Sequence, residues 1–429
     1  MTVIDLGELR DDPVPEPARR RSRPTGRPYR LLGVLAVALL TLAGGVPLVG
    51  WPAVAVPARP GANVFLSGDR LYLIEPPDLD RNEGRRLTAY RIPAAGPPTL
   101  LWRSRLPEGG GAEIGLLDRG GTVVLTGLSG VGDDAHRTFT VDARTGRPGW
   151  QQPGFAFEAV DGVLLQTSDA DGAVTVRRVE LPSGRALWSV SSPPGGLDFG
   201  FGPAGIDRIV LSSSAGEVEV RDARTGTRLV ARDLSAGGPR SWEGIQLVDG
   251  LLLTFADKGA TVTGYDLDRL ERRWTARLDR GGYLSPCGTL LCTSSDTGGM
   301  SVLDPATGAV RWSDPHWHQV MREHAGRFLV TAADAGRASR YAVVESATGR
   351  PLAELGGDWE LVNRAGPDDP LIGLRRGADG RLRVAELDLT AARAQVFAAP
   401  PGLIGDCQVG AGVLVCRRID GGFVLWRLR

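Results

Sequence analysis

Most of the chain after residue 60 alternates between apolar and polar positions in short runs. Examples are GVLLQTS at 162–168, DRIVLSSS at 207–214 and GRFLVTAA at 326–333, each bounded by Gly, Asp or Pro. Alternation over four to eight residues between such boundaries is typical of β-strands that bury one face. The chain has 59 Gly and 30 Pro among 429 residues, which is too many for a helical bundle, while 42% apolar residues are too many for disorder. The pattern therefore predicts an all-β, turn-rich fold.

The N-terminal part follows a different pattern. Residues 1–30 are polar and Pro-rich and end in a cluster of six arginines, and no charged residue occurs from Leu31 to Ala58. A helix of about 20 apolar residues crosses the hydrocarbon core of a membrane, and arginines before it place the preceding tail in the cytoplasm. The predicted parts are a cytoplasmic tail at 1–30, a transmembrane helix that anchors the chain at 31–56, a linker at 57–62 and an extracytoplasmic domain at 63–429.

A cleaved signal peptide is the alternative to this anchor. Ala53-Val54-Ala55 fits a small-x-small cleavage site. Both interpretations place the part of the chain after residue 58 outside the cytoplasm, and the anchored one makes the membrane a partner of residues 31–56.

The four cysteines occur in two close pairs, Cys287/Cys292 and Cys407/Cys416. In CQVGAGVLVC, a two-residue turn at Ala411-Gly412 places Cys407 opposite Cys416 across a hairpin, within the Cα distance that a disulfide requires. Four cysteines allow three pairings, and the spacing favours the two local ones. Disulfides persist in oxidising compartments, so this usage agrees with an extracytoplasmic domain.

One phrase recurs through the predicted extracytoplasmic domain: a strand that ends in Asp or Glu, a Thr/Ser-Gly turn, and a strand that carries Trp. The clearest copies are VDARTGRPGW at 141–150 and LDPATGAVRW at 303–312. Looser copies begin at 179, 221, 265, 344 and 387, and a degenerate first copy ends at Trp102. The Trp positions recur about every 42 residues on average. A repeat of this length with four short strands is typical of a propeller blade.

Each part of the phrase has a physical role. The acid can accept hydrogen bonds from the turn amides, the Gly adopts a positive φ, and the Trp is a large apolar plate suited to the gap between neighbouring blades. The residues predicted to have these structural roles are Asp142, Thr145, Gly146, Trp150, Gly184, Trp188, Asp222, Gly226, Asp266, Trp274, Asp304, Thr307, Gly308 and Trp312.

The number of copies predicts the number of blades. Eight copies predict an eight-bladed β-propeller of four-stranded blades, with seven blades as the alternative. Three further strands are expected near 403–407, 411–417 and 422–428. We expect them to complete a composite blade with N-terminal strands, because ring closure removes exposed strand edges.

The phrase resembles the tryptophan-docking repeat D-x-x-T-G-x-x-x-W of the pyrroloquinoline-quinone (PQQ) dehydrogenase superfamily, which residues 142–150 and 304–312 match fully. The layout of the chain resembles that of membrane-anchored PQQ-like propellers of actinobacteria. The resemblance implies a propeller over about residues 61–429. It implies no particular activity, because the superfamily includes non-catalytic propellers such as outer-membrane assembly lipoproteins.

The superfamily's enzymes hold PQQ over a calcium ion and typically cover it with a disulfide between adjacent cysteines. No two cysteines are adjacent in this chain, and no motif marks the calcium ligands or the catalytic Asp. We therefore expect no PQQ, no calcium and no catalytic residue, with a quinoprotein dehydrogenase or a metal-binding enzyme as the alternative.

Three of the four histidines, His316, His318 and His324, are clustered, and His136 is expected in a loop. If residues 316–318 formed a strand, His316 and His318 would share a face and offer half of a metal site. The alternative is an exposed loop, or a polar strand that lines the central channel.

The charge balance excludes one class of partner. Lys and Arg together number 50, as do Asp and Glu, so the formal net charge is zero, whereas nucleic-acid binders carry a basic surplus. The sequence thus predicts a non-catalytic, membrane-tethered propeller that binds a protein, peptide or glycan of the cell envelope. It leaves the partner and the oligomeric state open.

Overall fold

The computed structural model describes residues 53–78, 83–107, 113–128, 136–193, 196–202, 204–235, 243–278, 283–294, 299–332, 340–364, 366 and 368–428. The chain divides into two compact units, Met1–Leu48 and Val49–Arg429. The predicted cytoplasmic tail and residues 31–52 of the predicted transmembrane helix lie outside the described residues. No helix in the described ranges combines the length and hydropathy needed to cross a membrane.

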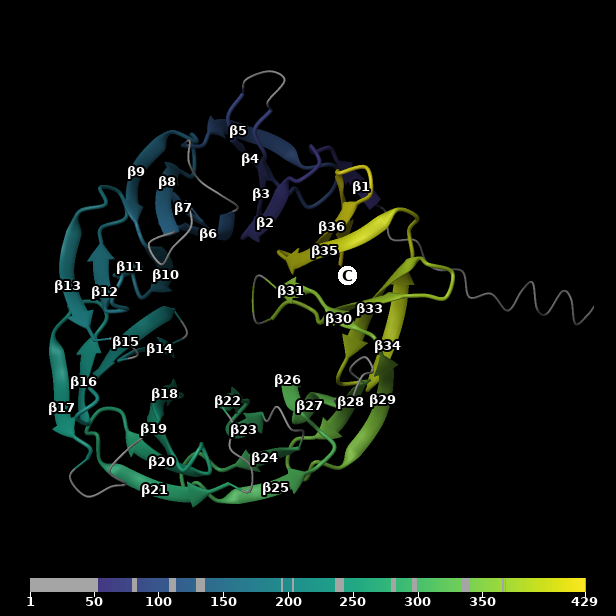
Figure 1. Cartoon of the computed structure of the whole chain (residues 1–429). Helices are drawn as coiled ribbons and strands as arrows, with labels where there is room; N and C mark the ends of the chain where they lie inside the picture. Colours follow the sequence, from purple (N-terminus) through teal and green to yellow (C-terminus); the bar gives the residue numbers. More distant parts are fainter. Residues whose placement is uncertain are drawn as a thin grey trace, which may run out of the picture. The chain divides into compact units, whose positions relative to one another are not determined.

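The described part of the Val49–Arg429 unit is all-β, and its strands form nine four-stranded antiparallel groups, here called blades 1 to 9 (Figure 1). Blade 1 consists of β2 (Asn63–Ser67), β3 (Arg70–Glu75), β4 (Arg86–Arg91) and β5 (Thr99–Arg105). Blade 2 consists of β6 (Glu113–Arg119), β7 (Thr122–Leu128), β8 (His136–Asp142) and β9 (Pro148–Pro153). Blade 3 consists of β10 (Phe155–Ala159), β11 (Gly162–Ser168), β12 (Val174–Val179) and β13 (Ala186–Ser192).

Blade 4 consists of β14 (Leu197–Gly202), β15 (Gly205–Ser212), β16 (Glu217–Asp222) and β17 (Arg228–Asp233). Blade 5 consists of β18 (Gly244–Val248), β19 (Leu251–Ala256), β20 (Thr261–Asp266) and β21 (Arg272–Arg277). Blade 6 consists of β22 (Tyr283–Cys287), β23 (Leu290–Ser294), β24 (Met300–Leu303) and β25 (Val310–Asp314). Blade 7 consists of β26 (Gln319–His324), β27 (Arg327–Ala332), β28 (Arg340–Glu345) and β29 (Pro351–Gly357). Blade 8 consists of β30 (Glu360–Leu361), β32 (Ile372–Arg376), β33 (Leu382–Asp388) and β34 (Arg393–Ala398). Blade 9 is β35 (Leu403–Gly410), β36 (Val413–Arg418), β37 (Phe423–Arg427) and β1 (Ala53–Val56).

Within a blade, the four strands pair in order from the centre outward. Figure 1 shows the first strand of each blade beside the central opening and the fourth at the outside. We call the first strands, such as β10, β14 and β22, the inner strands. Two parallel contacts join neighbouring blades: Ala159 of β10 pairs with Ile206 of β15, and β31 (Asn363–Arg364) pairs with β35.

The ring closes through β1, which pairs antiparallel with β37 so that Ala53 lies opposite Trp426 and Val56 opposite Phe423. The closing pairing between N- and C-terminal strands is as the sequence predicts. One boundary differs: residues 53–56 are a strand, so the range 31–56 given to the helix ends too late. The residues placed in the linker, 57–62, connect β1 to β2.

The count of blades also differs from the predicted eight, or seven, in the described residues. The three strands after the last repeat phrase do form a composite group with an N-terminal strand, β1, as expected. This group is the ninth because the first repeat already has four strands of its own in β2–β5.

The core lies between neighbouring blades. Leu253 and Trp274 of blade 5, for example, form one buried cluster with Leu291 and Leu303 of blade 6. Because each blade buries one face against the next, the inner strands are held at defined positions around the opening, where the candidate surface lies.

Candidate binding surface on the inner strands

The repeat phrase joins each blade to the next through its Trp and Gly. The indole Nε1 of Trp274 donates to the carbonyl oxygen of Pro305 in the next blade at 2.8 Å. Gly308 of the same turn has a φ of 69°, and a Cβ atom at this position would lie 2.5 Å from Cε3 of Trp274. The same arrangement joins Trp102 to Ala143 and Gly146, Trp150 to Leu181 and Gly184, Trp188 to Arg224 and Gly226, and Trp312 to Ser346 and Gly349.

The acids of the phrase brace these turns. Oδ1 of Asp142 accepts hydrogen bonds from the backbone amide and the hydroxyl of Thr145, both at 2.7 Å. These bonds favour the ionised carboxylate and lower the pKa of Asp142. Asp304 accepts from the amides of Ala306 and Thr307 and pairs with the guanidinium of Arg311. Because each acid is engaged in its own turn, these carboxylates form no common site.

Both disulfides have the local pairing that the spacing favours. Cys287 is bonded to Cys292, with a Cα–Cα distance of 5.9 Å, and Cys407 to Cys416, at 4.1 Å. Each joins the first two strands of a blade, and all four cysteines are buried. The turn at Ala411-Gly412 has positive φ at both residues, 51° and 70°, as a two-residue hairpin turn requires.

The histidines are not arranged as the metal hypothesis requires. His316 and His318 lie in a bend between β25 and β26 rather than in a strand, so the strand alternation that would align them does not apply. The side chain of His316 is 81% exposed, and its Nδ1 lies 3.2 Å from Oδ1 of Asp314. His324 ends β26. Among the residues described, no group of three or more His, Cys, Asp or Glu side chains could hold a metal ion.

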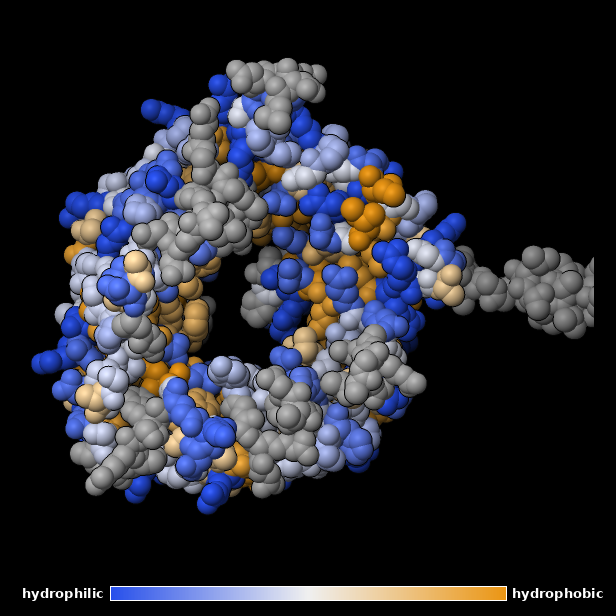
Figure 2. All heavy atoms as spheres, viewed as in Figure 1, coloured by the Kyte–Doolittle hydropathy of each residue, from blue (hydrophilic) through white to orange (hydrophobic). Residues whose placement is uncertain are grey.

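Large apolar side chains are exposed on several inner strands. Phe201 of β14 and Tyr283 of β22 are 69% and 79% exposed, and Met321 of β26 and Ile404 of β35 are also exposed. Figure 2 shows the opening that these strands surround, with hydrophobic residues along its edge beside β10 and β14. Single exposed apolar residues are common on proteins, but their recurrence on four inner strands makes these strands a candidate interaction surface.

Polar side chains fix the spacing of neighbouring inner strands. Asp198 of β14 accepts a hydrogen bond from the amide of Leu247 of β18 at 2.7 Å, and burial raises the pKa of its carboxyl. The side-chain amide of Gln246 exchanges hydrogen bonds with the backbone of Leu284 on β22. The exposed apolar residues therefore stand on a rigid frame.

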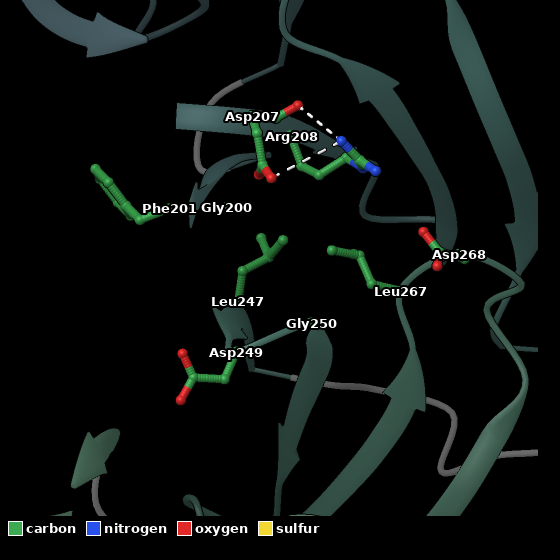
Figure 3. A pocket seen from close by; sticks show the side chains of 9 residues that line it. All are labelled: Gly200, Phe201, Asp207, Arg208, Leu247, Asp249, Gly250, Leu267 and Asp268. Carbon is green, nitrogen blue, oxygen red and sulfur yellow. Dashed lines mark hydrogen bonds and ion pairs between the residues drawn. The ribbon is translucent and has the colours of Figure 1, made fainter. Parts of the chain in front are cut away.

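A cavity of about 230 Å³ lies between blades 4 and 5 at the turn end of the ring (Figure 3). Figure 3 shows the side chains of Leu247 and Leu267 pointing toward one another across it, with carboxylates at its margin. These carboxylates belong to Asp207, Asp249 and Asp268. Phe201 and the guanidinium of Arg208 also line this cavity, so apolar and charged groups alternate around it among the described residues.

Sequence reasoning did not find the inner-strand surface. Phe201 and Tyr283 belong to no motif, and an exposed aromatic residue has the same hydrophobicity in the sequence as a buried one. Alternation in LDFGFG at 197–202 does not reveal it either, because the register of β14 shifts between Gly200 and Phe201, which leaves Phe199 buried and Phe201 exposed.

Comparison with known proteins gives one family match. Residues 90–313 match the model of the family described as outer membrane protein assembly factor BamB. No curated protein sequence matches the chain significantly.

Three solved structures are similar to this one. The structure of BamB from Moraxella catarrhalis is 15% identical with a TM-score of 0.45, over 88% of this chain and 97% of that chain. The computationally designed Ika8 protein is 20% identical with a TM-score of 0.47, over 75% of this chain and 97% of that one. A europium-containing methanol dehydrogenase is 12% identical with a TM-score of 0.44, over 78% and 83% of the two chains.

Proposed function

The chain belongs to the outer membrane protein assembly factor BamB family, and from this premise we propose that it is a non-catalytic binding module of the cell envelope. In this proposal the propeller is tethered to the membrane by residues 31–52, is extracytoplasmic, and binds a protein, peptide or glycan. The observation that carries the proposal is the apolar surface exposed on the inner strands, with Phe201 and Tyr283 as its largest side chains. Such surfaces mark interaction sites in soluble domains.

The side chains available for chemistry support binding rather than catalysis. The acids of the repeat are engaged in their own turns, and those on the inner strands, such as Asp198, accept backbone hydrogen bonds. Two observations support a function without PQQ and calcium: the described residues contain no cluster of three or more His, Cys, Asp or Glu side chains that could hold a metal ion, and both disulfides lie inside hairpins.

The proposed location rests on charge and redox chemistry. Arginines precede an uncharged segment of sufficient length for a membrane span, and two disulfides suit an oxidising compartment. Neither observation concerns the identity of the partner, which the following experiment addresses.

Photo-crosslinking in the native membrane tests the binding surface. We expect a benzoyl-phenylalanine placed at Tyr283 to form an adduct, and a matched probe at Leu229, which is 49% exposed on the outer strand β17, to form none. We expect Phe201→Asp to reduce the Tyr283 adduct at least fivefold, because a carboxylate on the apolar surface is costly to bury in a complex. Equal adducts at both positions would contradict the proposal.

The alternative, a PQQ- and calcium-dependent dehydrogenase, has a direct test on the purified full-length chain. We expect addition of PQQ and Ca²⁺ to produce no saturable difference absorption spectrum and no change in Tm. A saturable spectrum together with a rise in Tm would favour the dehydrogenase, because a ligand that binds only the folded state stabilises it.

A further inference from the structure

We propose that a cavity on blade 3 is a binding site for a neutral oligosaccharide. The cavity has a volume of about 520 Å³ and lies where the inner strand β10 begins. The lining side chains that matter here are His136, Phe155, Phe157, Gln166, Thr167 and Ser168. This inference rests on the proposed binding function and names its ligand class.

Aromatic rings form one wall of the cavity. The ring of Phe155 lies 5.4 Å from that of His136, edge to face, and 4.7 Å from that of Phe157. The row continues to Phe199 of blade 4 at 5.0 Å. Phe155 and Phe157 are only half-buried, so part of each ring is open to a ligand. A pyranose ring has an apolar face of C–H groups that packs on such aromatic surfaces.

Uncommitted polar groups stand beside these rings. Gln166 is the direct cross-strand partner of Phe155, so the two side chains share one face of the sheet, and Ser168 follows on the same face. The side chains of Gln166 and Ser168 form no hydrogen bond with any described residue. An amide offers two donors and an acceptor and a hydroxyl offers both roles. Sugar hydroxyls need this mixture of donors and acceptors.

Among the described residues that line this cavity there is no Asp, Glu, Lys or Arg, although 23% of the chain is charged. Two charged residues of blade 3 are engaged in other contacts: Arg177 donates to the carbonyl oxygen of Pro153, and Asp169 accepts from the amides of its own turn. By contrast, the cavity beside Tyr283 is lined by Asp198 and Glu243. An ionised ligand in the blade 3 cavity would lose water without gaining a counter-charge, so a neutral ligand is favoured.

The cavity exists because the connection before it is the shortest in the ring. The chain passes from β9 to β10 through Gly154 alone, whereas ten residues, 234–243, connect β17 to β18. Gly154 has a φ of 118°, and a Cβ atom there would lie 2.8 Å from the carbonyl oxygen of Gln166. Its amide donates to the carbonyl oxygen of His136 at 2.9 Å, which holds Phe155 beside that histidine. His136 begins β8, whereas the sequence analysis expected it to lie in a loop.

A peptide fits this chemistry less well. An apolar peptide side chain would leave the amide of Gln166 and the hydroxyl of Ser168 without partners, which is unfavourable for buried polar groups. A charged side chain would find no counter-charge. A neutral sugar satisfies the rings and the polar groups together.

The test uses the full-length chain in lipid nanodiscs, since glycoside detergents would themselves compete for the site. The probes are maltotetraose, chitotetraose and mannotetraose, measured by titration calorimetry. We expect at least one to bind saturably. We expect Phe155→Ala and Gln166→Leu each to weaken that binding at least tenfold, while Leu229→Ala, which removes an exposed apolar side chain on the outer strand β17 outside this cavity, leaves it unchanged. Tetragalacturonate, an acidic sugar, should bind at least tenfold more weakly than the best neutral probe.

Three outcomes would overturn the proposal: no saturable binding of any neutral probe, binding that both cavity variants leave unchanged, or equal binding of the acidic sugar. Gln166→Leu keeps the side-chain volume nearly constant, so it tests the site even if Phe155→Ala does not fold. The Tyr283 photo-adduct is an independent readout of the binding function. If the Tyr283 adduct forms but no sugar binds, only the oligosaccharide proposal is rejected. If the adduct does not form either, the proposed binding function is rejected as well.

Discussion

The Gly308–Trp274 contact has counterparts of different size at other blade interfaces. Where blade 4 has Val230 in place of Trp, the turn of blade 5 has Leu270 in place of Gly, with the same hydrogen bond to Asp266 and a φ of 53°. Leu270 is fully buried and Val230 packs against its cluster. The larger turn residue thus fills the volume that the missing indole leaves, which explains why the repeat phrase matches only in part at these positions.

The first prediction concerns the contact between Gly308 and Trp274. Gly308→Ala forces a side chain into the left-handed region, at a cost of about 1–2 kcal/mol, and against the Trp274 ring, at a further cost of about 1–3 kcal/mol. Gly380→Ala is the matched control, because Gly380 has a φ of 75° and no atom within 4 Å of its added Cβ. We expect Gly308→Ala to lower the free energy of unfolding by about 1–3 kcal/mol more than the control does, as measured by denaturant titration. Equal losses would contradict the docking role.

At the level of elements, closure depends on the short strand β1. Val56 of β1 is 3% exposed and lies in a buried cluster with Leu71 of blade 1 and Phe423 and Leu425 of β37. Without β1, the outer edge of β37 would present unpaired N–H and C=O groups to solvent. The strand therefore contributes to the sheet and to the packing between blades 9 and 1.

The second prediction is that the mature protein retains β1. Cleavage after Ala55 would leave only Val56 of the four residues that pair with β37. We therefore expect intact-mass spectrometry of the protein from its own membrane to find residues 53–55 present.

The importance of the strand can be measured separately. We expect Val56→Asp to lower Tm substantially, because it buries an unpaired carboxylate, whereas Ala53→Asp, at the exposed start of the same strand, should change Tm little. A mature N-terminus at Val56, or equal effects of the two variants, would contradict a structural role for β1.

Over the whole molecule, the repeated turns add up to a dependence of stability on pH. Hydrogen bonds or ion pairs in the turns lower the pKa of six carboxyl groups, in Asp142, Glu180, Asp222, Asp266, Asp304 and Glu345. A lowered pKa stabilises the folded state above the ordinary pKa, and this contribution is lost as the pH falls through the lowered one. Buried Asp198, whose pKa is raised, has the opposite effect.

The third prediction follows from this balance. We expect Tm to be nearly constant from pH 7 to about pH 5 and to fall below the ordinary carboxyl values of 3.8 and 4.5. Thr145→Ala should lower Tm at pH 7, because it removes the hydroxyl that donates to Asp142, and this difference should shrink as Asp142 becomes protonated. Thr145→Ser retains the hydroxyl and should behave like the parent chain. A difference that persists at pH 2.5 would show that the Thr methyl group matters instead.

The features that sequence analysis predicted correctly depend on short stretches of chain. The turn acids, the glycines of positive φ and the Cys407–Cys416 hairpin all involve residues within about ten positions of one another, so their spacing is visible in the sequence. The 42-residue repeat likewise indicates a propeller, because each blade repeats the same strands and turns.

Other features depend on residues that meet only when the ring is folded. Pairing of the C-terminal strands with an N-terminal strand was expected from the sequence, but no local pattern shows that the first repeat already has four strands of its own, which makes the group of β35–β37 and β1 the ninth. The blade 3 cavity depends on the single-residue turn at Gly154, which holds β10 beside His136 of blade 2. Exposure of an apolar side chain is set by the neighbours that pack on it, and for Phe155 and Tyr283 those neighbours belong to different blades, so their exposure could be determined only from the folded ring.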